Sequence, residues 1–382
     1  MKKSVRVFYI TVFAAAVALP LLLSAVFGKM TVSADSENRQ LAQRPVLSAA
    51  TLTTYPNLFE SYFSDNLPFR DALLTVNGLA EYKVLHSTQS DSVIIGKKGW
   101  LFYKGSQVNG EDPIADYEGT NLFTEEQLQQ IAQNMTAARD ELSSRGMQFV
   151  IMVCPNKERA YAEYMPDSYG RLTSRGREDQ VVEYLQKNTD LTVVCPYETI
   201  EDYKAANPQD QLYYKYDTHW NNLGSYIGAR ELLKTLDVEE LPDLSTVERS
   251  DGHVPVYDLA RLLHLGNQLK DDPAPVLEGI AEHAITSEHN DALTVFRYTC
   301  TDGGEDDRKV FIIGDSFSTM MAPYVALRFN NVYEGFYYNY ALSQLEEEQP
   351  KIVIYETVER YLNNMLNFSI TTGIGAKQAA AQ

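Results

Sequence analysis

The chain has 382 residues, enough for one large domain or for two to three smaller ones. Hydrophobic residues make up 44% and charged residues 22%, which are ordinary globular proportions and exclude a mainly disordered, collagen-like or multi-span membrane chain. The 33 Lys and Arg residues against 52 Asp and Glu give a net charge of -19, and a field of this sign disfavours nucleic-acid binding through a basic surface.

An apolar stretch without a charge spans residues 8–27, after Lys2, Lys3 and Arg6. A helix of this length reaches about 30 Å, the thickness of a bilayer core. We predict that residues 1–29 form a single membrane helix, and the preceding basic residues predict a cytoplasmic N-terminus and an extracytoplasmic body. Two alternatives are a cleaved signal segment, which would give a secreted protein, and a buried soluble helix.

Residues 30–88 read as an extracytoplasmic stalk followed by one or two helices. Short apolar runs at 93–95 and 100–103 flank a glycine-containing turn and predict a β-hairpin. Thr124 and Gln127 have the spacing of a capping box and predict the start of a long amphipathic helix. The apolar run 148–154 then predicts a strand covered on both faces.

The same alternation of strand and helix continues along the chain. Further strands are predicted at 191–195, 310–313, 332–337 and 352–355, with helices at 175–187, 223–236, 320–327 and 358–366. This alternation predicts an α/β fold in which helices flank a mostly parallel sheet. We assign residues 89–370 to this domain, with an acidic insertion at about 238–307 that carries a short helix at 259–265, and residues 371–382 to a flexible tail.

Sites in open α/β sheets form where strands end, so the residues that follow each predicted strand are candidates. Ser316 lies in Gly314-Asp315-Ser316-Phe317-Ser318, between a predicted strand and a helix. A serine at such a turn is exposed, and the helix N-terminus favours a developing oxyanion. The alternative is that Ser316 only caps the helix.

Asp217 and His219 lie in a second motif, Asp217-Thr218-His219-Trp220. If this segment is extended, residues two apart point to the same side, so the carboxylate can orient the imidazole as a base for a nucleophilic serine. A histidine in a surface loop is the alternative for so short a motif. A metal site is a further alternative, but the other histidines show no paired ligand spacing and we predict none.

A third strand end carries Asn156 and Lys157. The Asn156 amide could donate to an oxyanion and Lys157 could hold a substrate, whereas the alternative is a turn with solvated charges. Cys154 is expected to be a small buried residue, and the three cysteines of the chain predict no disulfide framework.

Taken together, these motifs resemble the SGNH-hydrolase-like domains of the AlgX/AlgJ type alginate O-acetyltransferase superfamily, and more closely the DHHW family. The resemblance covers nearly the whole chain, because several short motifs occur in the same order. They are Glu37-Asn38-Arg39 with Leu41-Ala42 and Pro45, Phe69-Arg70, the hairpin residues 99–103, Pro155-Asn156-Lys157, Asp217-Thr218-His219-Trp220, residues 314–318 and residues 355–361. Thr218 departs from the second histidine of the DHHW name, and the Gly and Asn signatures of SGNH esterases are not recognisable.

The resemblance implies a flavodoxin-like three-layer fold and a catalytic triad of Ser316 as nucleophile, His219 as base and Asp217 as its orienting carboxylate. It also suggests substrate or oxyanion contacts from Asn156, Lys157, Asp315, Trp220, Arg360 and Tyr361. The implied activity is O-acetylation of a cell-surface or exported polysaccharide, without a cofactor, with acetyl supplied by a membrane-bound O-acyltransferase partner. The same triad would also suit a carbohydrate acetylesterase, and a non-catalytic glycan-binding or scaffold protein is a third interpretation.

Overall fold

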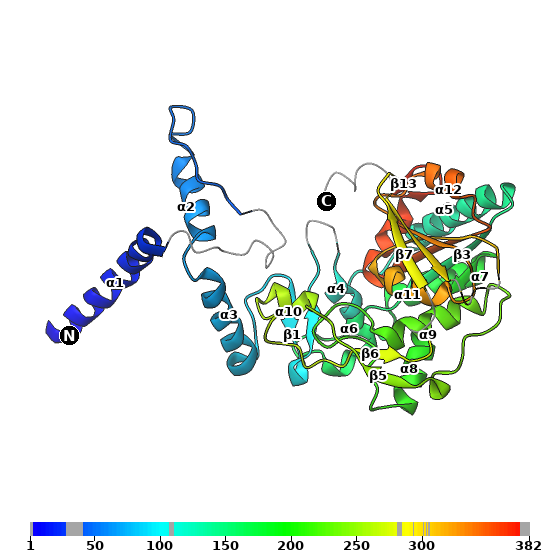
Figure 1. The fold of residues 1–382 in the computed structure, drawn as a ribbon, viewed down its shortest axis with the longest axis horizontal. Helices are drawn as coiled ribbons and strands as arrows, with labels where there is room; N and C mark the ends of the chain where they lie inside the picture. The colour runs from blue at the N-terminus through cyan, green and yellow to red at the C-terminus, as the bar shows by residue number, and fades with distance from the viewer. Residues whose placement is uncertain are drawn as a thin grey trace. The chain divides into compact units, whose positions relative to one another are not determined.

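A computed structural model describes residues 3–27, 41–106, 111–280, 285–292, 294–300, 302, 304 and 306–374. The chain divides into two compact units (Figure 1). One comprises Met1–Ser90 with Val256–Leu269, and the other comprises Asp91–Pro255 with Lys270–Gln382. The first part of the predicted stalk, up to residue 40, and residues 375–382 of the predicted tail lie outside the described residues, as does the Glu37-Asn38-Arg39 motif.

The first unit is helical. It contains α1 (Lys3–Phe27), α2 (Tyr55–Asp65), α3 (Arg70–Ala80), which continues as a π-helical turn (Glu81–Leu85), and α10 (Asp258–Leu262). The Thr75 hydroxyl on α3 donates to the His264 carbonyl oxygen at 3.1 Å, which ties α3 to the segment after α10. In the part of the chain that the structure describes, no helix combines the length and apolarity that crossing a membrane requires, so the predicted membrane helix is not confirmed.

The second unit is built on a seven-stranded mixed sheet in the order β4-β3-β11-β9-β10-β8-β7. The five strands from β4 to β10 in this order are parallel: β4 (Thr192–Val194), β3 (Gln148–Cys154), β11 (Ile352–Val358), β9 (Val310–Gly314) and β10 (Val332–Phe336). Antiparallel β8 (Val295–Cys300) and β7 (Ile285–Asn290) complete the sheet. The predicted α/β fold is therefore confirmed, and the sheet that the sequence describes as mostly parallel is mixed.

Alternate residues of the central strands pack on opposite faces of this sheet. Val150, Met152 and Ile312 join the core that lies under α9 (Asn222–Leu233) and α11 (Ser316–Val325). Phe149, Ile151 and Phe311 join the core that lies under α5 (Glu125–Ser144) and α7 (Arg177–Asn188). This period of two gives a three-layer arrangement, which Figure 1 shows for the unit that carries the sheet.

Two local features predicted from the sequence, the capping box and the hairpin, are confirmed. Thr124 and Gln127 form a capping box at the start of α5, with the Thr124 N–H donating to Gln127 Oε1 at 2.9 Å. The predicted hairpin is β1 (Val93–Ile95) paired antiparallel with β2 (Leu101–Tyr103). Its turn contains Lys98 and Gly99 in the left-handed region, at φ 54° and 75°.

Two regions are more specific in the structure than in the prediction. The predicted insertion at about 238–307 contains β7 and β8, which extend the central sheet. The predicted helix at 358–366 is a 3₁₀-helix over Glu359–Leu366. The remaining elements of this unit are short: α4 (Pro113–Glu118), α6 (Lys157–Ala160), 3₁₀ turns at Lys97–Gly99, Ala162–Tyr164 and Leu244–Thr246, α8 (Tyr197–Ala206), β5 (Arg249–Asp251), β6 (Pro275–Leu277), α12 (Leu342–Glu348), β12 (Phe368–Ser369) and β13 (Gly373–Ile374).

Candidate active site

Ser316 lies at the junction between β9 and α11. All five residues of β9 are buried, Asp315 caps α11, and Ser316 is the first residue of the helix. Gly314 is required at this turn, because a Cβ there would lie 2.5 Å from Ser318 Oγ and 2.8 Å from Glu356 Oε2. The turn therefore holds Ser316 at the carboxyl edge of the sheet, half-buried, at the positive end of a helix.

Asp315 fixes the start of α11 against the neighbouring strand. It is buried, and its Oδ1 accepts from the Phe317 N–H at 2.9 Å while its Oδ2 accepts from the Val358 N–H at 2.9 Å. Its own N–H donates to Glu356 Oε2 at 3.0 Å. Both carboxylate oxygens thus bind backbone groups, which makes Asp315 part of the support of Ser316.

His219 contacts both Asp217, two positions before it, and Ser316, 97 positions after it. His219 Nε2 lies 2.7 Å from Ser316 Oγ, and His219 Nδ1 lies 2.6 Å from Asp217 Oδ1. The side chains of His219 and Asp217 are 23% and 12% exposed, so the row of three groups reaches solvent at the imidazole. Since both ring nitrogens are engaged, the imidazole is arranged to take a proton from the serine hydroxyl.

The local conformation of the Asp217 motif differs from the extended segment that the sequence analysis considered. Asp217 and His219 lie in a bend, closed by a hydrogen bond from the His219 N–H to Asp217 Oδ1 at 3.1 Å. Tyr213 and Trp220 form a β-bridge across the base of this bend. An aspartate that binds its own backbone two residues on is typical of an Asx turn, so the same bend both shapes the loop and pairs the two side chains.

Trp220 anchors the loop to the serine-bearing helix. Its side chain is fully buried, its indole N–H donates to the Phe317 carbonyl oxygen at 3.2 Å, and its ring lies 5.0 Å from the Phe317 ring. The next residue, Asn221, caps α9 by accepting from the N–H groups of Leu223 and Gly224. Trp220 therefore lies inside the protein and connects the His219 loop to the start of α11.

The carboxyl ends of β3 and β11 bring further predicted residues to the same edge. The Asn156 amide donates to Asp116 Oδ2 at 3.1 Å and its oxygen accepts from the Arg360 N–H at 3.2 Å. The Arg360 guanidinium is buried and lies 5.3 Å from the centre of the Phe317 ring and 5.1 Å from that of Tyr361. Arg360 thus lies against the residue that follows Ser316, whereas Asn156 is engaged inside the protein.

Two buried acids under the site were not predicted as functional residues. Glu334 on β10 accepts from Ser318 Oγ at 2.6 Å, and Glu356 on β11 accepts from the Asp315 N–H. Burial raises the pKa of both carboxyls, and the neighbouring Asp315 charge adds to the rise at Glu356. A glutamate inside an otherwise apolar strand is the sequence signal that points to such positions.

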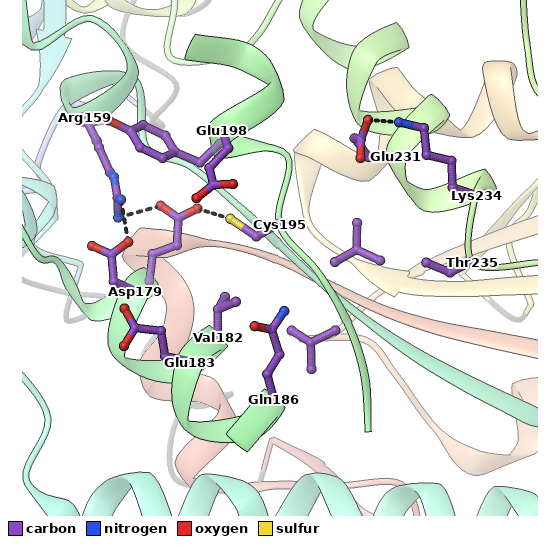
Figure 2. Close-up of a pocket in the computed structure, with 14 residues that line it drawn as sticks. Arg159, Asp179, Val182, Glu183, Gln186, Cys195, Glu198, Glu231, Lys234 and Thr235 are labelled. Carbon is purple, nitrogen blue, oxygen red and sulfur yellow. Dashed lines mark hydrogen bonds and ion pairs between the residues drawn. The ribbon is translucent and has the colours of Figure 1, made fainter. Parts of the chain in front are cut away.

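A separate cavity of about 460 Å³ lies beside β4 (Figure 2). Asp217, His219 and Ser316 are not among the residues that line it. Glu178 there accepts from the Cys195 thiol at 2.8 Å and pairs with Arg159 at 3.1 Å. Burial raises the pKa of Glu178 to about 7, while the Arg159 charge opposes the rise. These contacts make Glu178, Arg159 and Cys195 one buried polar cluster beside the cavity.

Comparison with known proteins identifies the domain. Residues 93–329 match the family model of the SGNH hydrolase-like domain of the acetyltransferase AlgX, a span that includes Asp217, His219 and Ser316. The chain belongs to this family. The predicted membership of the AlgX/AlgJ-type superfamily is thereby confirmed.

The relatives of this family include alginate acetylation proteins. The chain is 23% identical over 235 residues to the probable alginate O-acetylase AlgJ of Pseudomonas syringae, covering 61% of this chain and 52% of the relative. The chain thus spans about half the length of that relative.

Two solved structures are similar in part. The O-acetyltransferase domain of Pseudomonas putida AlgJ has a TM-score of 0.47 at 18% identity, covering 71% of this chain and 92% of that domain. A DHHW family protein from Eubacterium siraeum has a TM-score of 0.46 at 15% identity, covering 76% of this chain and 97% of that protein. Scores this low add nothing to the family assignment.

Proposed function

We propose that the protein is an O-acetyltransferase that modifies hydroxyl groups of a polysaccharide and uses Ser316 as its nucleophile. The observation that carries the proposal is the unbroken row of hydrogen bonds from Asp217 through His219 to Ser316, at 2.6 and 2.7 Å. These distances are within the reach required for proton transfer from a hydroxyl to an imidazole. Membership of an acetyltransferase family supports the choice of acyl group.

In this mechanism His219 Nε2 takes the proton of Ser316 Oγ as the oxygen attacks the acetyl carbonyl carbon. The tetrahedral intermediate collapses and the leaving group departs with a proton from the imidazolium, leaving acetyl on Ser316. A sugar hydroxyl then gives its proton to His219 and attacks the acetyl carbon, so the ester moves to the sugar and Ser316 regains its proton. Asp217 stabilises the imidazolium in both halves of the reaction.

The positive end of α11 and the buried Arg360 favour the negative charge that develops on the carbonyl oxygen. Arg360 and Tyr361 remain the predicted substrate or oxyanion contacts, since Arg360 lies beside Phe317 and Tyr361 lies beside Arg360. The N-terminus of α11 and the Arg360 guanidinium thus bring positive charge near Ser316 in a molecule whose net charge is -19.

The proposal also includes a location outside the cytoplasm and a membrane-bound partner that supplies acetyl. The support for the location is the position of Lys2, Lys3 and Arg6 before the apolar stretch. The partner follows from the family resemblance, because an extracytoplasmic acetyltransferase needs an acetyl donor on its own side of the membrane.

Turnover of a chromogenic acetate ester by the full-length chain tests the nucleophile. We expect Ser316→Ala to abolish turnover and Ser144→Ala, which changes an exposed serine of α5, to leave it unchanged. Equal rates in the Ser316→Ala variant and the unmodified protein would refute the proposal, as would a failure of Ser316 to react with a serine-directed phosphonate.

A mass measurement distinguishes transfer from hydrolysis. The protein is incubated with an acetyl donor and glycan oligomers, and we expect oligomers that are heavier by one or more acetyl groups. Free acetate with unmodified oligomers would instead identify a carbohydrate acetylesterase with the same triad.

A further inference from the structure

Lys157 is a buried lysine whose ammonium donates to three backbone carbonyl oxygens. It is the first residue of α6, and it is 1% exposed. Its Nζ donates to the carbonyl oxygens of Leu101 at 2.6 Å, Lys215 at 3.0 Å and Asp217 at 2.8 Å. An ammonium has three N–H donors, so these carbonyls occupy all of them.

The surroundings of the ammonium explain why a charge is stable there. Nζ lies 5.2 Å from the ring centres of both Trp100 and Phe102, whose faces attract a cation. A buried charge is costly unless it is fully hydrogen-bonded, and here it is. Lys157 therefore has neither the exposure nor a remaining donor for the substrate contact that its position after β3 suggests.

The three carbonyls belong to two separate parts of the protein. Leu101 is in the hairpin strand β2, and its own N–H donates to the Lys215 carbonyl oxygen at 3.0 Å. Lys215 and Asp217 are in the loop that carries His219. Lys157 thus joins the hairpin to this loop, and it does so at the backbone of the residue whose carboxylate binds the imidazole.

A second set of contacts holds the same loop from another segment. Asp272 Oδ2 accepts from the Tyr216 N–H at 3.1 Å, and the Tyr216 hydroxyl donates to Asp271 Oδ1 at 2.9 Å. The remaining Asp272 oxygen accepts from the Gln211 amide at 2.6 Å. These bonds hold the residues before Asp217, whereas Lys157 donates to the carbonyl oxygen of Asp217 itself.

We propose that Lys157 is a positioning residue, which holds the backbone of Asp217 so that its carboxylate stays in line with His219 and Ser316. The inference rests on the proposed function, because it assigns Lys157 to the support of the same triad. Lysine suits this role because its compact ammonium can direct three donors at three carbonyls, whereas the planar fork of arginine cannot. Small displacements matter here, since a shift of about 1 Å in a catalytic group can cost on the order of 100-fold in rate.

The first experiment compares Lys157→Met with Lys204→Met in the full-length protein. Lys204 is a matched control, because its ammonium also lies over an aromatic ring, 4.4 Å from the centre of the Tyr161 ring, and also donates to a backbone carbonyl, that of Ala160. We expect Lys157→Met to lower kcat for a chromogenic acetate ester by about 10- to 100-fold with little change in KM. Lys204→Met should leave both constants within about 3-fold of the unmodified protein.

A double-mutant cycle with Asp217→Asn tests whether Lys157 acts through Asp217. We expect Lys157→Met to cost less than about 3-fold in kcat when Asp217 is already asparagine, because the carboxylate it positions is gone. A loss as large as in the unmodified background would overturn the proposal, as would an unchanged kcat in the single variant. If Lys157 had only a structural role, Lys157→Met would lower kcat by the same factor in the unmodified protein and in the Asp217→Asn variant.

Lys157→Arg keeps the proposal testable if the methionine variant does not fold. It retains the charge and the contact with the aromatic rings but not the three-carbonyl geometry, so we expect a folded protein with reduced kcat, and full activity would refute the inference. The two proposals fail differently. An active Ser316→Ala variant would remove the proposed function, whereas an inactive Ser316→Ala variant beside a fully active Lys157 variant would remove only the positioning role.

Discussion

Replacing Asp315 should destabilise the protein by an amount that the two bonds of its carboxylate predict. Asp315 Oδ1 accepts from Phe317 N–H, which is the cap of α11, and Oδ2 accepts from Val358 N–H at the end of β11. Asp315→Ala removes both acceptors. Asp315→Asn keeps an acceptor for the cap but places an amide group where Val358 needs an acceptor.

The sizes of the two losses can be added. Loss of an N-cap acceptor costs about 0.5–2 kcal/mol. A buried N–H left without an acceptor, here that of Val358, costs about 1–3 kcal/mol. We therefore expect Asp315→Ala to lower the free energy of unfolding by about 1.5–5 kcal/mol and Asp315→Asn by about 1–3 kcal/mol.

Urea unfolding followed by tryptophan fluorescence measures these differences. Trp220 reports on the site directly, because its ring packs against Phe317 at the start of α11. Thr124→Ala is the matched control: it removes the exposed cap of α5 and should cost about 0.5–2 kcal/mol with no loss of ester turnover. If Asp315→Ala were no more destabilising than Thr124→Ala, the bond to Val358 would contribute nothing and the reasoning would be wrong.

Two further variants test the turn before Ser316 and the cavity beside β4. Gly314→Ala should cost about 1–3 kcal/mol in urea unfolding, because its Cβ would meet Ser318 Oγ at 2.5 Å, whereas Gly170→Ala, with no atom within 4 Å of the added Cβ, should be close to neutral; equal stability of the two variants would contradict this. For Glu178, burial raises the pKa from 4.5 in the unfolded chain to about 7 in the folded protein, so its contribution to stability is full below pH 4.5 and is lost as pH rises through 7. Glu178→Gln should therefore flatten the fall in the free energy of unfolding between pH 4.5 and 7, and a slope equal to that of the unmodified protein would exclude this assignment.

Local sequence signals predicted the elements that depend on neighbouring residues. The capping box at Thr124 and the apolar run of β3 each follow from short-range rules, and both are present in the structure. The antiparallel strands β7 and β8 were missed because most residues of β7 are exposed and polar, which hides the pattern of a sheet strand. Only their pairing with β10 makes them part of the sheet.

The residues of the candidate site show the same difference between what local sequence signals predict and what distant contacts decide. The motif at Ser316 follows a strand and begins a helix, as the sequence predicted. The motif at His219 lies in a bend between two helices, which the sequence did not predict. Trp220 follows His219 in the chain, and Asn156 and Lys157 follow the end of β3, so all three were predicted as site residues. Their side chains are nevertheless buried inside the protein. Their partners are backbone atoms and side chains 40 or more positions away, which no local pattern records.

By itself, then, the amino-acid sequence determined local elements such as the capped helix α5 and the buried strand β9, and it marked Ser316, His219 and Asp217 as candidates, because capping and periodicity depend on neighbours along the chain. The tertiary structure alone decided that a serine and an imidazole 97 positions apart meet at 2.7 Å, and that a lysine close to them supports the loop from inside. The physical reason is that this contact joins the carboxyl end of β9 to the loop between α8 and α9, and a hydrogen bond between segments so distant in sequence forms only when the whole domain packs.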